Sequence, residues 1–320
     1  MKLLRHAVIG ALLALPMLAA AQNYPNKPIR LVVPWPPGTP PDVLGRVVSE
    51  RMSAGLGQPV IVENKPGAAG VIGLGEVLRN PADGYTAYLM SSASLVAPLL
   101  FPTQNINFAK SLSPVGMVAW SYNVLVAPVD SPLTSATKVV ESARAQPGRL
   151  SFASGGNGSP AHLAGELLNQ KAGIDTLHVP YNQFSQAVGD LLAGRVDYMF
   201  LTASAALAHI EGGKLRPLAV TAPKRLPALP ETGNMIEQGF NDFALNSFDG
   251  IAVKAGTPQP IIDRLNTELN RALSDPGVRE RLGTFALEPQ AMTPQEFGEV
   301  LAAGSEQWLA IGRKANIQAD

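Results

Sequence analysis

The sequence of 320 residues has no cysteine, no net charge, and only 16% charged and 6% aromatic residues. Without cysteine the chain can form no disulfide, no Cys-ligated zinc or iron–sulfur site and no thiol nucleophile. Its 25 Lys and Arg residues balance 25 Asp and Glu residues, and no long basic run is present, so the charge pattern of a nucleic-acid binder is missing. The 46% of hydrophobic residues is ample for packed cores, and the length suggests about two domains.

The N-terminus has the pattern of a secretory signal peptide. Lys2 and Arg5 precede an apolar stretch at residues 7–18, which runs into the small residues 19–21. The alternative, a membrane anchor, needs about 20 apolar residues, more than this stretch offers, and no later segment reaches 18. We expect a signal peptide at residues 1–21, cleavage before Gln22, and a mature protein free in the periplasm. Gln22 cannot carry the lipid that a cysteine there would accept.

After the signal, short apolar runs alternate with helical patterns, which favours an α/β architecture with mainly parallel strands. Strands are predicted at residues 29–33, 60–63, 85–90, 123–127, 150–153, 178–181, 196–201, 218–220 and 248–253, and helices at 43–52, 67–78, 135–145, 160–171, 187–193 and from 258 onward. Two halves joined near residues 125 and 250 predict two lobes with a cleft between them. Lobe one would hold residues 22–125 and 250–320, and lobe two residues 126–249. Ligands of open α/β sheets bind at the carboxyl ends of the strands, so the loops there are the candidate site.

The first such loop, residues 34–42, is rich in proline, which fixes the backbone and removes amide donors. The remaining N–H groups include those of Gly38, Thr39 and Asp42. Asp42 stands where a helix cap belongs, so capping and ligand contact both remain open for it. Trp35 either stacks on a ligand or wedges the lobes apart.

The second loop, residues 154–160, is rich in glycine and leads into a helix. Glycines permit close backbone approach, and free amides at a helix N-terminus favour an anion such as a carboxylate or phosphate. Ser159 as the cap and Pro160 as the first helical residue are the structural alternative. Residues 156–161 also match the G-x-G-x-x-A pattern of dinucleotide sites, but an exported protein meets little nicotinamide cofactor.

Patterns for catalysis are scarce. The histidines outside the signal form no H-E-x-x-H zinc motif, and neither a G-x-S-x-G elbow nor a P-loop occurs. The remaining enzymatic hypothesis is an exported hydrolase in which His162 serves Ser159, three residues before it on the same helix face. A Ser that caps a helix is already committed to backbone amides, however. We therefore expect no enzyme activity, no cofactor and no metal.

Taken together, these segments resemble one family, the exported substrate receptors of tripartite tricarboxylate transporters, also called Bug or TctC receptors. The resemblance covers essentially the whole chain after the signal, in order. The segments that carry it are residues 34–42, 62–70 (VENKPGAAG), 82–86 (ADGYT), 156–163 (GNGSPAHL), 178–181 (HVPY), 190–197 (DLLAGRVD), 213–220 (GKLRPLAV) and 256–258 (GTP).

The resemblance implies a two-lobed periplasmic binding protein of the type II (flytrap) class that closes on a small carboxylate. It also implies integral membrane transporter subunits as partners, and we expect no nucleic acid and a monomer. An orphan receptor that feeds a signalling partner would share all these features. The residues to which the family's contacts carry over are Trp35, Gly38, Thr39, Asp42, Ser92, Ser94, Asn157, Gly158, Ser159 and Tyr181.

The chain departs from the family pattern at three places. Thr39 stands for the second glycine of loop one, Phe184 lies where a Lys-Gly-Gly run is usual, and Leu201 replaces a frequent Asp. These changes predict a tighter, less polar pocket in which Phe184 contacts the ligand. We therefore expect a carboxylate with an apolar or aromatic body, and an amino acid's ammonium group is disfavoured because no Asp is there to pair with it.

Overall fold

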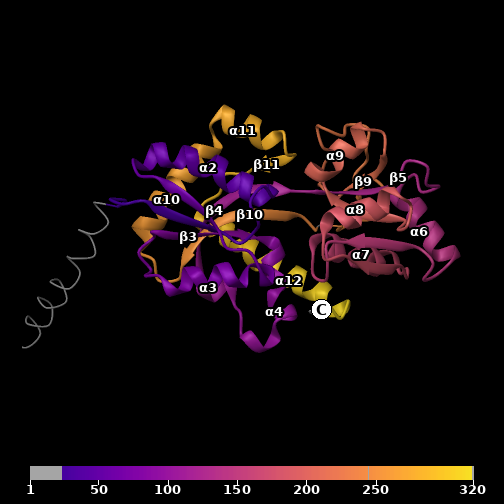
Figure 1. Cartoon of the computed structure of the whole chain (residues 1–320), viewed down its shortest axis with the longest axis horizontal. Helices are drawn as coiled ribbons and strands as arrows, with labels where there is room; N and C mark the ends of the chain where they lie inside the picture. Colours follow the sequence, from indigo (N-terminus) through magenta and orange to yellow (C-terminus); the bar gives the residue numbers. More distant parts are fainter. Residues whose placement is uncertain (1–23, 244, 319–320) are drawn as a thin grey trace, which may run out of the picture.

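The computed structural model describes residues 24–243 and 245–318, which form two lobes side by side (Figure 1). The predicted signal peptide lies outside the described residues. Lobe one is built on a sheet of strand order β11-β4-β10-β3-β1-β2, and lobe two on a sheet of order β7-β6-β8-β5-β9. The strands of lobe one are β1 (Ile29–Val33), β2 (Val60–Asn64), β3 (Thr86–Ser91), β4 (Leu112–Ser121), β10 (Ser247–Lys254) and β11 (Leu287–Pro289). Those of lobe two are β5 (Asn123–Pro128), β6 (Ser151–Ser154), β7 (Leu177–Pro180), β8 (Tyr198–Thr202) and β9 (Leu215–Val220).

Helices cover both sheets. Lobe one has α2 (Pro40–Leu56), α3 (Val71–Arg79), α4 (Ala97–Leu100), α5 (Phe108–Ser111), α10 (Gln259–Leu273), α11 (Pro276–Gly283) and α12 (Pro294–Lys314), with short 3-10 helices η1 (Ala68–Gly70), η2 (Ser92–Val96) and η3 (Pro102–Gln104). Lobe two has α6 (Ala136–Ala145), α7 (Pro160–Ala172), α8 (Phe184–Leu192) and α9 (Ala203–Glu211). No helix among the described residues has both the length and the apolar character needed to cross a membrane.

The prediction of mainly parallel strands was wrong. The pairs β1–β2, β1–β3, β6–β7 and β6–β8 are parallel, whereas β10 runs antiparallel to β3 and β4, β11 to β4, and β5 to β8 and β9. Parallel pairing is confined to the β-α-β units, in which a helix carries the chain back to the same end of the sheet. The strands through which the chain leaves a lobe or returns to it run the other way.

The chain passes between the lobes twice near the middle of the molecule. β4 ends at Ser121 and β5 begins at Asn123, so the first passage is at Tyr122. The return lies between β9 and the start of β10 at Ser247. The predicted joints at residues 125 and 250 thus fall inside β5 and β10.

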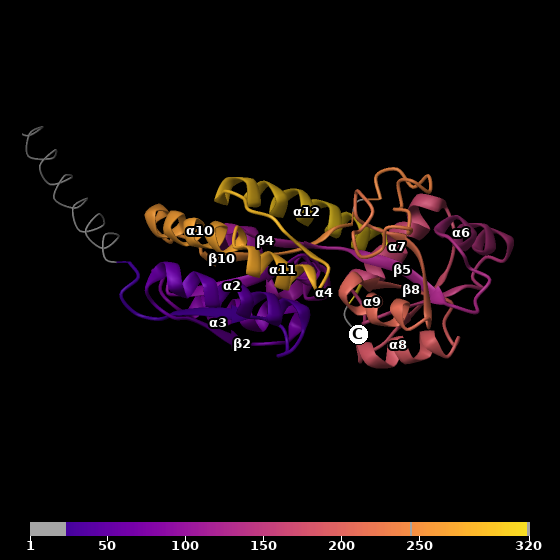
Figure 2. The same ribbon diagram turned by 90° about the horizontal axis from the view of Figure 1, so that it is seen from above.

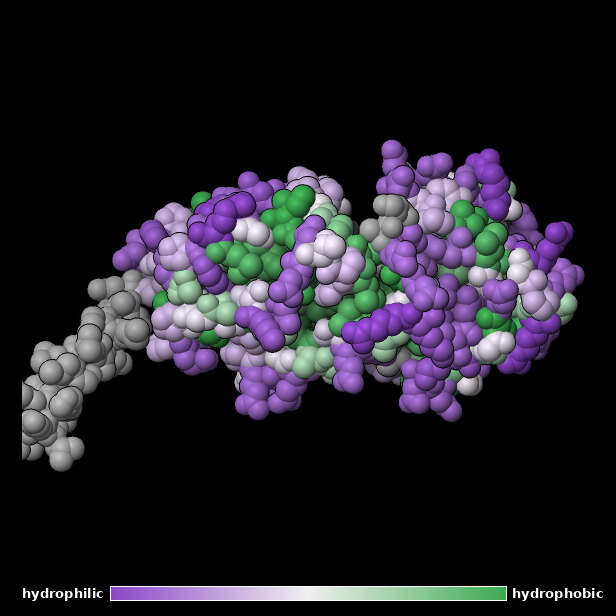
Figure 3. All heavy atoms as spheres, turned by 90° about the horizontal axis from the view of Figure 1, so that it is seen from below, coloured by the Kyte–Doolittle hydropathy of each residue, from purple (hydrophilic) through white to green (hydrophobic). Residues whose placement is uncertain are grey.

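The C-terminal helix α12 connects the lobes, as Figure 2 shows from above. It packs on β4 and η2 of lobe one and on α7 of lobe two, where Gln170 Nε2 donates to the carbonyl of Ile311 at 3.3 Å. Its start is fixed by a capping box between Thr293 and Glu296. From below, apolar residues gather where α4 and the end of α12 meet lobe two (Figure 3).

The predicted amphipathic helix near the C-terminus is confirmed as α10. The residues of its expected apolar stripe, Ile261, Ile262, Leu265, Leu269 and Leu273, are all buried in one cluster with β1, α2 and β10. This cluster fills one face of the lobe-one sheet, and a second cluster fills the other face and continues into lobe two. The two packed faces make lobe one a stable platform for the loops at the ends of its strands.

Candidate functional site

Loop one connects β1 to α2 and faces lobe two. The helix begins at Pro40 with Thr39 as its cap residue, so the alternative that Asp42 is the cap was wrong. Thr39 Oγ1 donates to the carbonyl of Pro36 at 2.7 Å instead of capping an amide. Proline at the first helical position is compatible with helix geometry, which explains why α2 starts earlier than the apolar periodicity suggests.

Asp42 is buried in the first turn of α2 and holds loop one together. Its Oδ2 accepts from the Gly38 amide at 2.9 Å and from Arg46 Nε at 3.1 Å, and its Oδ1 accepts from Asn64 Nδ2 at 2.8 Å. Burial alone would raise the pKa of this carboxyl, but the hydrogen bonds from Arg46, Asn64 and Gly38 bring it below its usual value. Both Asp42 and the Gly38 amide are thus engaged in positioning the loop.

Two of the other lobe-one candidates, Ser92 and Ser94, are deeply buried. Ser92 Oγ accepts from the amide of Phe248 at 3.3 Å, and Ser94 is packed beside Tyr88 and Gly70. Trp35 packs against the α2–α10 cluster, and its Nε1 is buried with no hydrogen-bond partner among the described residues. Of the six lobe-one candidates, Trp35 and Thr39 are partly exposed and Gly38 is exposed, whereas the other three are buried.

Loop two connects β6 to α7, and the structural alternative for Ser159 and Pro160 is confirmed. Ser159 caps α7 by accepting from the His162 amide at 3.4 Å, and Pro160 is the first helical residue. Gly156 and Gly158 have φ of 104° and 74°, a backbone region that favours glycine. A Cβ on Gly158 would lie 3.2 Å from Leu100 and 3.3 Å from Val96, so loop two, with Asn157 within it, reaches lobe one.

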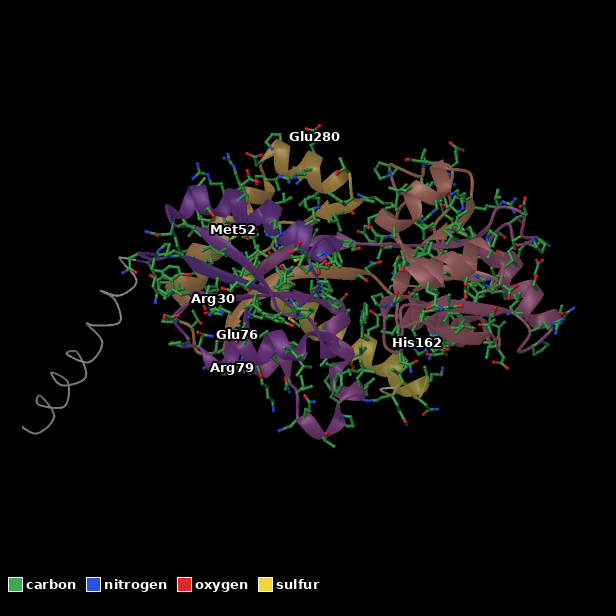
Figure 4. The ribbon with its side chains drawn as sticks, viewed as in Figure 1. Arg30, Met52, Glu76, Arg79, His162 and Glu280 are labelled. Atoms are coloured by element: carbon green, nitrogen blue, oxygen red, sulfur yellow. The ribbon has the colours of Figure 1, made fainter. Side chains whose placement is uncertain are left out.

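Two stacked histidines, His162 and His178, pack against loop two. Nothing in the sequence indicated this stacking. The rings of His162 and His178 are 3.6 Å apart and nearly parallel. Nδ1 of His162 accepts from the Gly158 amide at 3.2 Å, and His178 Nε2 lies 2.6 Å from Ser154 Oγ. Burial, followed by the neighbouring His178, lowers the pKa of His162 to about 3, so its ring is neutral and able to accept. Figure 4 shows His162 at the end of α7 that faces lobe one.

This arrangement does not make a nucleophile. Ser159 Oγ bonds the backbone of His162, not its ring, and the hydroxyl that does face a histidine, on Ser154, is fully buried. Within the described ranges, no cluster of three or more His, Cys, Asp or Glu side chains is placed to hold a metal ion.

The remaining candidates flank loop two. Tyr181 donates its hydroxyl to Asp190 at 2.7 Å, and Asp190 also pairs with Arg195 at 2.7 Å. Phe184 begins α8, is 43% exposed, and lies against Gly155. Leu201, in contrast, is fully buried in the core. Phe184 is therefore the apolar departure that remains available to a ligand beside loop two.

Two further features escaped the sequence analysis. Residues 67–70 all have positive φ, including Ala68 at 48° and Ala69 at 49°. A positive φ strains the backbone of alanine, and such strained residues are most frequent in functional loops. Asp249 on β10 is buried, its Oδ1 has no hydrogen-bond partner among the described residues, and burial raises its pKa to about 7. The Gly-Ala-Ala-Gly run is a visible signal in the sequence for the positive φ angles. The environment of Asp249, in contrast, depends on the pairing of strands.

The charged cluster in lobe one belongs to its scaffold. Arg30 on β1 pairs with Glu63 at 2.8 Å and with Glu76 at 2.9 Å, and Arg79 extends the cluster on α3 (Figure 4). These hydrogen bonds raise the pKa of Arg30 and, through Arg30 first and then Arg79, lower the pKa of Glu76 to about 2. The cluster ties α3 to the sheet. Loops one and two themselves contain no Lys or Arg.

Comparison with known proteins agrees with this picture. A family model described as the tripartite tricarboxylate transporter family receptor matches residues 27–317. A protein of the tcbD–tcbE intergenic region of Pseudomonas sp. is 36% identical over 90% of this chain and 86% of its own length. Protein BugT of Bordetella pertussis is 35% identical over 98% of this chain and 97% of its own length.

Solved structures show the same fold. The periplasmic binding protein BugD is similar with a TM-score of 0.78 and 32% identity, over 93% of this chain and 100% of its own. An R. palustris protein solved with adipate has a TM-score of 0.80 and 29% identity, over 92% of this chain and 99% of its own. MatC from Rhodopseudomonas palustris, solved with malate, has a TM-score of 0.77 and 27% identity, over 90% of this chain and 99% of its own. The fold is that of a two-lobed periplasmic binding protein, and the family and these neighbours are solute-binding receptors, not enzymes.

Proposed function

Because this chain belongs to the tripartite tricarboxylate transporter receptor family, we propose that it captures a small organic carboxylate between its lobes and delivers it to membrane transporter subunits. The family is periplasmic, and cleavage of residues 1–21 would release this chain there. The bound state would be reached by hinge closure, with the passages at Tyr122 and before β10 as the hinge.

Loop two carries the proposal. A glycine-rich loop supported by His162 leads into the positive end of the 13-residue helix α7, and this end faces lobe one. Because neither loop has a Lys or Arg, the carboxylate would be held by amides, hydroxyls and bridging waters. The solved neighbours that bind adipate and malate support this ligand class.

A finer proposal concerns the part of the ligand that is not the carboxylate. The partly exposed Phe184 beside Gly155 supports an apolar or aromatic group next to loop two. Leu201 is fully buried and therefore does not contribute to ligand contact.

The test is a thermal-shift screen of the purified protein against aliphatic, dicarboxylic and aromatic carboxylates, with sugars and amino acids as contrasts. A ligand at 100 times its Kd adds about 2.7 kcal/mol, which raises the melting temperature by several degrees. The absence of any shift by carboxylates, in protein shown by mass spectrometry to carry no co-purified ligand, would contradict the proposal.

A matched pair of variants locates the site. Ser159→Ala should weaken carboxylate binding by about 1 kcal/mol, or roughly fivefold in Kd, since Ser159 shapes loop two. Ser135 caps α6, away from both loops, by accepting from the Lys138 amide at 3.1 Å. Ser135→Ala should therefore lower stability without changing the affinity, and equal effects of both variants on affinity would argue against loop two as the site.

A further inference from the structure

Asp249 is a carboxyl group that the fold leaves unsatisfied. It stands on β10, 6% exposed, between β3 and β4 in the middle of the lobe-one sheet. Ser91 on β3 is its neighbour across the ladder and hydrogen-bonds one carboxyl oxygen, but Oδ1 has no partner among the described residues. A buried polar atom without a partner costs stability, and native folds retain few of them unless a ligand or water completes the site.

Trp35 lies two residues beyond the end of β1, which is at Val33. The pairing of Arg30 with Thr86 and Val32 with Tyr88 places residue 35 opposite Ser91 when the register is continued, and Ser91 is opposite Asp249. Trp35 packs on the face of the sheet that carries Ile251, two residues after Asp249, so both side chains are on that face. In that continued register their backbones would be two strand spacings apart, about 10 Å, which two side chains and one small group can span.

The two orphaned atoms are complementary. Trp35 Nε1 is a donor only, and ionised Asp249 Oδ1 is an acceptor only. A carboxylate oxygen would satisfy the indole but repel Asp249, and an ammonium would satisfy Asp249 but offers nothing to the indole. A hydroxyl group satisfies both, since it accepts and donates at once.

We propose that Trp35 and Asp249 bind a hydroxyl group on the ligand, so that this receptor prefers hydroxycarboxylates to the same acids without the hydroxyl. The proposal rests on the proposed function, because Trp35 lies in loop one and Asp249 lies near the start of β10, where the chain returns from lobe two. The carboxylate of the ligand is held at loop two, and its hydroxyl lies against the lobe-one sheet.

Burial raises the pKa of Asp249 to about 7, and only the hydrogen bond from Ser91 acts against this. A ligand hydroxyl that donates to Oδ1 would favour the ionised form and lower this pKa. A site built to hydrogen-bond a hydroxyl rejects the analogue that lacks it, because its own buried groups then stay unpaired. Specificity is therefore the property to measure.

The experiment compares matched probes by isothermal titration calorimetry: malate, each enantiomer, against succinate, and mandelate, each enantiomer, against phenylacetate. In the unaltered protein the hydroxylated member of a bound pair should bind about tenfold tighter. Asp249→Ala removes the acceptor and Trp35→Phe removes the donor while keeping a ring. Each should reduce this preference to about twofold or less with little effect on the acid that lacks the hydroxyl.

Asp130→Ala, at an exposed carboxyl in the turn after β5, is the control and should leave the preference intact. Chemical denaturation of each variant checks that it folds, and Asp249→Asn, which keeps an acceptor oxygen, provides a second, milder variant that should retain part of the preference. Equal affinity for both members of a pair, or a preference that survives both Asp249→Ala and Trp35→Phe, would overturn the inference while leaving the receptor function in place. Failure of all four acids and of the wider carboxylate screen would instead refute the proposed function and, with it, this inference.

Discussion

Replacing His162 by phenylalanine should change how the stability of the protein depends on pH. The ring of His162 is buried, stacks on His178 and accepts from the Gly158 amide at 3.2 Å. Phenylalanine keeps the ring but can neither accept this hydrogen bond nor titrate. Orphaning the Gly158 amide should lower the free energy of unfolding by about 1–3 kcal/mol at pH 7 to 8.

The pH dependence follows from the depressed pKa of His162. In the folded protein this pKa is about 3, against 6.5 in the unfolded chain, because burial and then His178 disfavour the charged ring. The unfolded state therefore binds the proton more readily, so the stability contributed by neutral His162 is present above pH 6.5 and is lost as the pH falls. Each pKa unit corresponds to about 1.4 kcal/mol, so the loss between pH 7 and pH 5 amounts to about 2 kcal/mol.

The assay is urea denaturation of the original protein and of His162→Phe at pH 5, 6, 7 and 8. The other titrating groups contribute to both proteins, so the difference between the two free energies of unfolding reports on His162. This difference should shrink by about 2 kcal/mol from pH 7 to pH 5. A difference that stays constant across this range would refute the reasoning that a buried neutral imidazole holds loop two.

Four further substitutions test other parts of the structure. Phe184→Gly should widen the range of accepted acids towards bulkier and more polar ones, and an unchanged ligand profile in the thermal-shift screen would show that Phe184 is not part of the site. Gly165→Ala would place a Cβ against the buried ring of Phe152 and should destabilise the fold by about 1–3 kcal/mol. Gly189→Ala, with no atom within 4 Å, should instead stabilise α8 by about 0.5–1 kcal/mol, and denaturation curves that rank the two variants otherwise would contradict the packing. Glu288→Gln weakens the contacts that β11 makes with Tyr122 at 2.8 Å and Lys224 at 2.9 Å, on the sheet edge away from loops one and two. Closure at the loops would pull the lobes apart at this edge, so loss of these contacts should raise the ligand affinity measured by calorimetry roughly twofold to fivefold, with a stability change below about 1 kcal/mol. Weaker binding by the variant would contradict this description of the hinge.

Local signals in the sequence were sufficient for the elements around loop two. The strand predicted at residues 150–153 is observed at 151–154, and the helix predicted at 160–171 is observed at 160–172. The cap at Ser159 and Pro160 at the first helical position were also readable, because each feature depends on residues close together in the chain. Loop one was harder to interpret. Its consecutive prolines allow the helix to begin at Pro40, so the acidic residue that looked like a cap is inside the first turn.

The direction of the strands was not readable from local patterns. An apolar run in β4 or β10 has the same appearance whether its neighbour is parallel or antiparallel, since both are buried on two faces. The prediction of mainly parallel sheets failed for this reason, and the predicted joints fell a few residues inside β5 and β10.

The sequence by itself determined the family, the α/β class, the two loops and the cap of α7, because these are recorded in motifs and in short-range periodicity. Only the tertiary structure decided which side chains remain available in those loops. It engages Asp42 with Arg46 and Asn64, stacks His162 on His178, and pairs Asp249 with Ser91, which the continued register of β1 places opposite Trp35. These partners are brought together by sheet register and helix packing over separations of up to about 200 residues, and no local pattern of residues encodes such distances.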